Sequence, residues 1–137
     1  MTGRLVEIVA GVLRDADGRV LTVRKRRTSA FMLPGGKREP GESDLEALAR
    51  ELAEEIGCHL IHTKALGLFE APAANEPDTQ VRGAIYLASV DGPIAAQAEI
   101  EEMLWIDPTA PPGVRLAPLL ETHVLPRLGI GPTFPTG

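Results

Sequence analysis

The chain has 137 residues, 44% of them hydrophobic, a composition typical of one globular domain. Its formal net charge of −5 and its aromatic content of 4% argue against binding to a nucleic acid polymer, whether through the overall field or through base stacking. The negative charge also disfavours an anionic membrane surface, and no apolar run approaches the ~20 residues of a membrane span.

The first part of the sequence predicts two strands joined by a tight turn. Residues 5–13 are rich in Val, Ile and Leu, residues 15–18 (DADG) have turn chemistry, and residues 19–26 alternate apolar and polar side chains. We therefore predict a β-hairpin. A short apolar run follows at 31–33 and is stopped by a Pro-Gly-Gly segment.

Residues 43–56 give the clearest helix prediction. Ser43 and Glu46 have the spacing of a capping box, and Gly57 stands where a glycine commonly ends a helix. Apolar residues at helical spacing predict one buried stripe, made of Leu45, Leu48, Leu52 and Ile56.

The rest of the chain predicts three more strands and a second helix. The strands are expected at 59–70, 81–90 and 102–107, and the helix at 116–125. We predict one α/β domain over residues 1–128, with a mixed sheet covered on both faces, and a loose tail over residues 129–137.

Three carboxylates lie together beside the apolar stripe of the first helix. Spacings of three and four residues place Glu51, Glu54 and Glu55 side by side, and Ala47 one turn earlier leaves that face open. Converging carboxylates repel unless a cation joins them, and Mg²⁺ prefers oxygen ligands. The simpler alternative is a solvated charged helix face, but Arg50 is the only base in the helix.

The same region resembles the Nudix box. The matching positions are Gly36, Glu42, Arg50-Glu51-Leu52, Glu54-Glu55 and Gly57. The single departure is Cys58, where an aliphatic residue is usual, and a buried cysteine behaves as a small hydrophobe. The resemblance extends to FMLPGGK before the box and AEIEEMLWID after it, and it implies an α/β/α sandwich.

The resemblance also implies roles for these residues. The Gly36 carbonyl, Glu51, Glu54 and Glu55 would bind Mg²⁺ or Mn²⁺, and one of the glutamates would serve as or hold the base for water. Arg50 would orient the glutamates and Glu42 would complete the network. Glu99, six residues before Trp105, is the expected additional acid, with Glu101 and Glu102 as alternatives.

Basic residues near the box are candidates for binding substrate phosphates. Lys37 and Arg38 follow the two glycines, and Arg24 and Arg26 belong to the basic run 24–27. Because strand residues alternate, at most half of that run faces one site, and a solvated strand end is the alternative. Phe69, Asn75 and Tyr86 are weaker candidates for contact with a base, with packing as the simpler interpretation.

The expected function is Mg²⁺-dependent cleavage of a nucleoside diphosphate derivative. A MutT-like enzyme acting on nucleoside triphosphates is the leading hypothesis. An ADP-ribose or nucleoside diphosphate sugar pyrophosphatase is the second, because the family loosely associates a proline near position 72 with ADP-ribose hydrolysis. A non-catalytic nucleotide sensor is the third. Homodimers are common in the family that the chain resembles, so a homodimer is an expected assembly. Cys58 is the lone cysteine, which allows no intramolecular disulfide and favours a cytoplasmic location.

Overall fold

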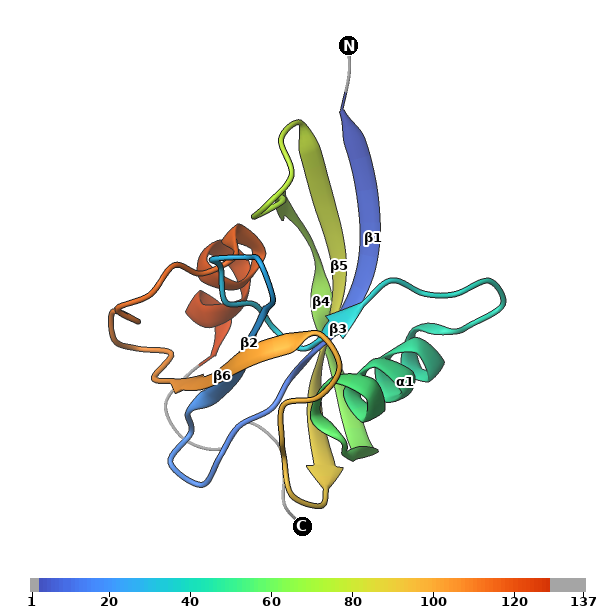
Figure 1. Ribbon diagram of the computed structural model, residues 1–137, viewed down its shortest axis with the longest axis vertical. Coiled ribbons are helices and arrows are strands. Elements are labelled where there is room, and N and C mark those ends of the chain that lie inside the picture. Colours follow the sequence, from blue (N-terminus) through green and yellow to red (C-terminus); the bar gives the residue numbers. More distant parts are fainter. Residues whose placement is uncertain (1–2, 129–137) are drawn as a thin grey trace.

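The computed structural model describes residues 3–128 and contains a mixed four-stranded sheet (Figure 1). The strand order is β3-β1-β5-β4, where β3 is Gly35–Gly36, β1 is Arg4–Val12, β5 is Thr79–Asp91 and β4 is His59–Pro72. β1 and β5 are parallel, whereas the other two pairs are antiparallel. The predicted mixed sheet is therefore confirmed.

A second sheet consists of β2 (Val20–Lys25) and β6 (Ile100–Ile106), which pair antiparallel. The predicted hairpin of residues 5–13 with 19–26 is therefore wrong beyond the turn: the Leu21 amide donates to the Leu13 carbonyl at 2.9 Å, but the two strands otherwise pair with other partners. The turn does form, because the Asp15 amide donates to the Arg19 carbonyl at 3.0 Å, and an isolated bridge joins Arg14 to Val20. The residues from Val20 to Val23 are fully buried on both faces, so β2 leaves β1 and lies inside the molecule against β6.

Helix α1 (Asp44–Ile56) has both of its predicted ends. The Ser43 hydroxyl accepts from the Glu46 amide at 3.1 Å, and the Glu46 carboxylate accepts from the Ser43 amide at 2.9 Å. Gly57 ends the helix in the left-handed conformation. The capping box and the glycine stop are therefore confirmed.

The predicted apolar stripe of α1 is partly wrong. Leu48, Leu52 and Ile56 are fully buried, but Leu45 is 42% exposed because it lies in the first turn, outside the buried cluster that those three residues join. Ala47 is also fully buried, so it does not leave the open face that its small size suggested.

The predicted helix at 116–125 is wrong in its start and its form. Ala117 donates to the Phe31 carbonyl at 2.8 Å, and Leu116 forms a parallel bridge with Phe31, so these residues are extended. A π-helical turn, η1 (Leu119–Val124), follows Pro118, and a 3₁₀ turn, η2 (Leu125–Arg127), ends the described chain. The tail predicted at 129–137 lies outside the described residues.

Apolar side chains cover both faces of the four-stranded sheet. On β1, Val9 joins the cluster beneath α1, whereas Ala10 and Val12 join the cluster that contains Leu119 and Leu120 of η1. The predicted α/β/α sandwich is thus present, with α1 on one face and η1 on the other (Figure 1). Within residues 3–128, no helix is long and apolar enough to cross a bilayer.

Candidate active site

A cleft of about 460 Å³ follows β1 along the sheet. It extends from Ala10, which pairs with Gly35, to Val6, which pairs with Val81. At about 3.3 Å per strand residue, these two positions are roughly 13 Å apart. The end near Gly35 is lined by five charged side chains, those of Lys25, Lys37, Glu51, Glu54 and Glu99. The other end is lined by Val6, Val81 and the tip of the β4–β5 hairpin.

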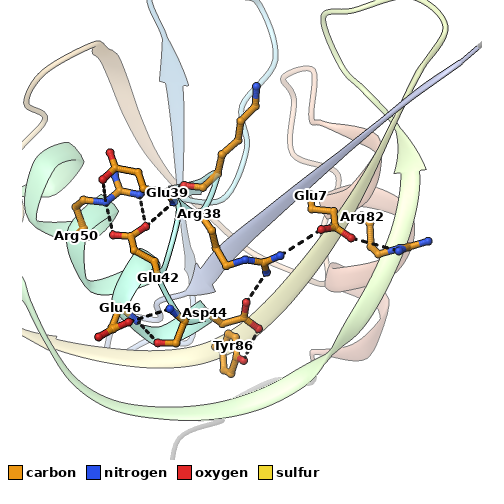
Figure 2. A network of polar contacts seen from close by, with 11 residues as sticks. Glu7, Arg38, Glu39, Glu42, Asp44, Glu46, Arg50, Arg82 and Tyr86 are labelled. Atoms are coloured by element: carbon orange, nitrogen blue, oxygen red, sulfur yellow. Dashed lines mark hydrogen bonds and ion pairs between the residues drawn. The ribbon is translucent and has the colours of Figure 1, made fainter.

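Arg50 connects Glu42 of the loop before α1 (Figure 2) to the Glu51 carboxylate of the helix. Its Nε and Nη2 donate to the two Glu42 oxygens at 2.7 and 2.9 Å, and Nη2 also donates to the Lys37 carbonyl at 3.0 Å. Its Nη1 donates to Glu51 at 3.1 Å and lies 3.6 Å from a Glu54 oxygen. Hydrogen bonds from Arg50 and from the Glu39 amide lower the pKa of Glu42 to about 2.

Glu55 is buried behind the cleft. It is 3% exposed, and its Oε1 accepts from the Gly35 amide at 3.2 Å. Burial raises the pKa of Glu55 to about 8, with the neighbouring Glu51 carboxylate adding to the rise and Lys25 opposing it. Glu55 therefore differs from Glu51 and Glu54, because it does not line the cleft and its protonated form is stable near neutral pH.

The second glycine of β3 allows the helix to approach the loop closely. A Cβ atom added at Gly36 would lie 2.4 Å from Oε2 of Glu51, far inside van der Waals contact. Glycine at this position therefore lets the Glu51 carboxylate lie directly against the loop backbone.

Glu99 is the one acid of the loop before β6 that lines the cleft. Its Oε1 lies 3.8 Å from Lys25 Nζ, and its carbonyl accepts from the Arg26 amide at 2.9 Å. Glu101 and Glu102, the alternatives from the sequence, pair with Arg26 and Arg24 outside the cleft.

The structure separates the four basic candidates. Lys37 lines the cleft. Arg38 does not, and it pairs with Asp44 at 2.6 Å and with Glu7 at 3.2 Å, two residues that also lie outside the lining (Figure 2). Arg24 and Arg26 do not line it.

Lys25 was missed as a site residue. It lines the cleft, although its neighbours in sequence, Arg24 and Arg26, do not. The alternation of strand residues limits how many side chains face one side, but it does not say which parity faces the site.

The donor set at the charged end fits a hard divalent cation in kind. Glu51 and Glu54 offer carboxylate oxygens, and Gly36 offers a backbone carbonyl. Because Gly36 has no Cβ, its backbone can lie next to the Glu51 carboxylate. Within the described part of the chain, however, no group of three or more His, Cys, Asp or Glu residues is arranged to hold a metal ion. Arg50, which bonds Glu51 and lies near Glu54, occupies part of the space between them. Metal binding therefore stays a prediction that the donor chemistry supports.

Known proteins are similar to this chain in sequence and in fold. The 8-oxo-dGTP diphosphatase of Escherichia coli is 33% identical over 81 residues, covering 56% of this chain and 60% of that protein. The CTP pyrophosphohydrolase of the same species is 38% identical over 58 residues, covering 39% of this chain and 42% of that protein. The matched segments therefore span less than two thirds of both relatives.

The fold and the family model agree. The crystal structure of a MutT NUDIX hydrolase from Burkholderia pseudomallei superposes with a TM-score of 0.70 at 23% identity, covering 82% of this chain and 90% of that one, which supports a common fold. The model of the NUDIX domain matches residues 4–125, which include every element that lines the cleft. The chain belongs to the Nudix domain family.

Proposed function

We propose that the protein is a Mg²⁺-dependent pyrophosphohydrolase that cleaves a nucleoside triphosphate into a nucleoside monophosphate and pyrophosphate. The observation that carries the proposal is the division of the cleft. One end has three carboxylates and two lysines, and the other has mainly aliphatic side chains, with Glu76 there paired to Arg4. A substrate with one base and a phosphate chain matches this division. The names of both Escherichia coli relatives specify nucleoside triphosphates, which supports the same substrate class.

Three groups that line the cleft would hold the metal, namely the Gly36 carbonyl, Glu51 and Glu54. The buried Glu55 would join them as a fourth ligand on losing its proton, which a bound cation favours. A bound Mg²⁺ would neutralise phosphate charge and lower the pKa of a coordinated water, and Mn²⁺ has the same preference for oxygen ligands. Arg50 would act as a positioning residue, because its hydrogen bonds to Glu42 and the Lys37 carbonyl fix the guanidinium that bonds Glu51.

Glu54 and Glu99 are the candidate bases, since both line the cleft and neither is buried. One of them would take a proton from the attacking water. The water oxygen would then bond to the α-phosphorus while the bond from that phosphorus to the leaving pyrophosphate breaks. Lys25 and Lys37, which line the same end, would pair with the negative phosphate oxygens.

A second substrate class is favoured by one observation. Pro72, the residue that the family loosely associates with ADP-ribose hydrolysis, lines the cleft. Cleavage of ADP-ribose or of a nucleoside diphosphate sugar yields two monophosphate products instead of pyrophosphate, so the products separate the two classes.

The test is a turnover screen with Mg²⁺ and chromatographic product analysis. The panel contains normal and oxidised nucleoside triphosphates, ADP-ribose and nucleotide sugars. Pyrophosphate release from a triphosphate is the expected result, and paired monophosphates would favour the second class. No product from protein that binds nucleotide would overturn hydrolysis and favour the sensor hypothesis.

Substitution of Gly36 by Ala tests the close approach of Glu51. The new Cβ would displace the carboxylate, so we expect turnover to fall by about tenfold to a hundredfold with little change in melting temperature, because a flexible side chain can move aside. Gly11→Ala is the matched control, since its Cβ would meet Leu48 Cδ1 at an ordinary 3.4 Å. Equal turnover in the two variants would contradict the proposed role of Gly36.

A further inference from the structure

The tip of the β4–β5 hairpin, residues 72–78, borders the end of the cleft farthest from the carboxylates. Residues 72–76 line the cleft there, on the side of the sheet that η1 covers (Figure 1). The Ala73 amide donates to the Thr79 carbonyl at 2.9 Å, and the Arg4 amide donates to the Asp78 carbonyl at 3.0 Å, so the hairpin bonds tie both sides of the tip to the sheet.

The side chain of Arg115, outside the cleft lining, bonds the backbone of this tip. Its Nη2 donates to the Ala74 carbonyl at 2.6 Å, and its Nη1 donates to the Ser29 hydroxyl at 2.6 Å. The carbonyl of Arg115 accepts from the Phe31 amide at 2.9 Å, which anchors the segment that carries it. Arg115 therefore links the backbone next to Asn75 to Ser29 through its side chain and to Phe31 through its carbonyl.

Asn75 has an unusual place among the cleft residues. Of the described side chains that line the cleft, it is the one that is uncharged and carries both a hydrogen-bond donor and an acceptor. No hydrogen bond joins its side chain to another described residue. The other two base-contact candidates are engaged elsewhere, because Phe69 stacks on His123 with centroids 5.6 Å apart and Tyr86 donates to Asp44 at 3.0 Å.

No aromatic side chain lines the cleft within the described residues, so a base there would lie against aliphatic groups such as Val6 and Val81. Apolar contact of this kind holds any base and does not distinguish one from another. Discrimination requires a hydrogen-bonding group at a fixed position, since the bases differ in the order of donors and acceptors along their edges.

We propose that Asn75 determines base preference by hydrogen bonding to the edge of the nucleobase, and that Arg115 is a positioning residue that holds the tip in place. This inference rests on the proposed function in one respect, namely that the ligand of the cleft is a nucleotide. It adds the residue that selects among nucleotides.

The experiment measures binding, so it does not depend on turnover. Dissociation constants for AMP, GMP, CMP and UMP are measured by calorimetry for the wild type, Asn75→Ala and Asp78→Asn. The wild type is expected to prefer at least one base by about fivefold to tenfold, the effect of one or two neutral hydrogen bonds. Asn75→Ala is expected to bind all four with similar constants. Asp78→Asn, on the same tip but outside the lining, should keep the wild-type preference.

Arg115→Met provides a second variant that leaves Asn75 in place. It should weaken the preference among the four monophosphates, since it releases the Ala74 carbonyl, while the melting temperature stays near that of the wild type because Arg115 is exposed. A wild type without base preference, or an Asn75→Ala variant that keeps it, would overturn the inference. Base-selective binding without turnover on any substrate would instead refute the proposed hydrolysis and leave the role of Asn75 intact.

Discussion

The Glu54→Gln variant is expected to lose about 10²- to 10⁴-fold of the metal-dependent turnover and to keep the wild-type melting temperature. Glutamine has nearly the same size but no negative charge, so it is a weaker metal ligand and cannot accept a proton as a base. Glu54 lines the cleft with a side chain that is 55% exposed, so the substitution removes no core packing. Its ion pair with Arg50 is long, at 3.6 Å, and contributes little to stability.

The matched control for Glu54 is Glu102→Gln. Glu102 has a similarly exposed side chain, at 58%, and also pairs with an arginine, Arg24, but it lies outside the cleft. Turnover of this control should stay within about twofold of the wild type. Equal effects of the two substitutions would mean that general loss of negative charge, not the place of Glu54 in the cleft, accounts for the result. A Glu54→Gln variant with wild-type turnover would refute its assignment as ligand or base.

Titration with Mg²⁺ separates the two roles of Glu54. If its main role is to hold the metal, higher Mg²⁺ concentrations should restore part of the turnover of Glu54→Gln. If its main role is to take the proton of water, the loss should persist at saturating Mg²⁺. The parallel variant Glu99→Gln, at the other candidate base in the cleft, identifies which of the two carboxylates behaves as the base.

The local structure around α1 could be predicted from the sequence because short-range chemistry determines it. The capping box and the left-handed Gly57 depend on residues a few positions apart, and both form as predicted. The grouping of Glu51 with Arg50 and Glu42 was implied by the resemblance to the Nudix box, and the hydrogen bonds of Arg50 join these residues.

Long-range pairing could not be predicted in the same way. The turn at 15–18 forms, but nothing near it in sequence indicates that β2 pairs with β6, some eighty residues away. Likewise, Leu116 pairs with Phe31 in extended conformation, so the helical turns of this segment begin later than the expected helix. Lys25 is a similar case, because which side of β2 faces the cleft depends on the sheet that β2 joins.

The burial of Glu55 was also beyond the reach of the sequence. Helical spacing places it beside Glu51 and Glu54 but does not show how far the neighbouring loop covers each side chain. In the structure the Gly35 amide and the surrounding core enclose Glu55, and its pKa rises to about 8 because of that burial.

The Leu52→Ala variant is expected to lower the free energy of unfolding by roughly 2–5 kcal/mol. Leu52 is fully buried in the cluster between α1 and the sheet, where its neighbours include Leu48 and Ile56. Removing most of its side chain loses the transfer free energy and leaves a cavity that close-packed neighbours fill only in part. Urea denaturation at equilibrium measures the change, and the slope of the transition should stay that of the wild type.

Leu45→Ala is the control for Leu52, with the same chemical change on the same helix. Because Leu45 is 42% exposed and outside the buried cluster, its loss should change the free energy of unfolding by only about 0.5 kcal/mol. A large difference between the two variants would confirm that the buried face of α1 begins after the first turn. Similar, large losses of unfolding free energy in both variants would mean that the Leu45 side chain is buried in solution. Small losses in both would refute the placement of the core beneath α1.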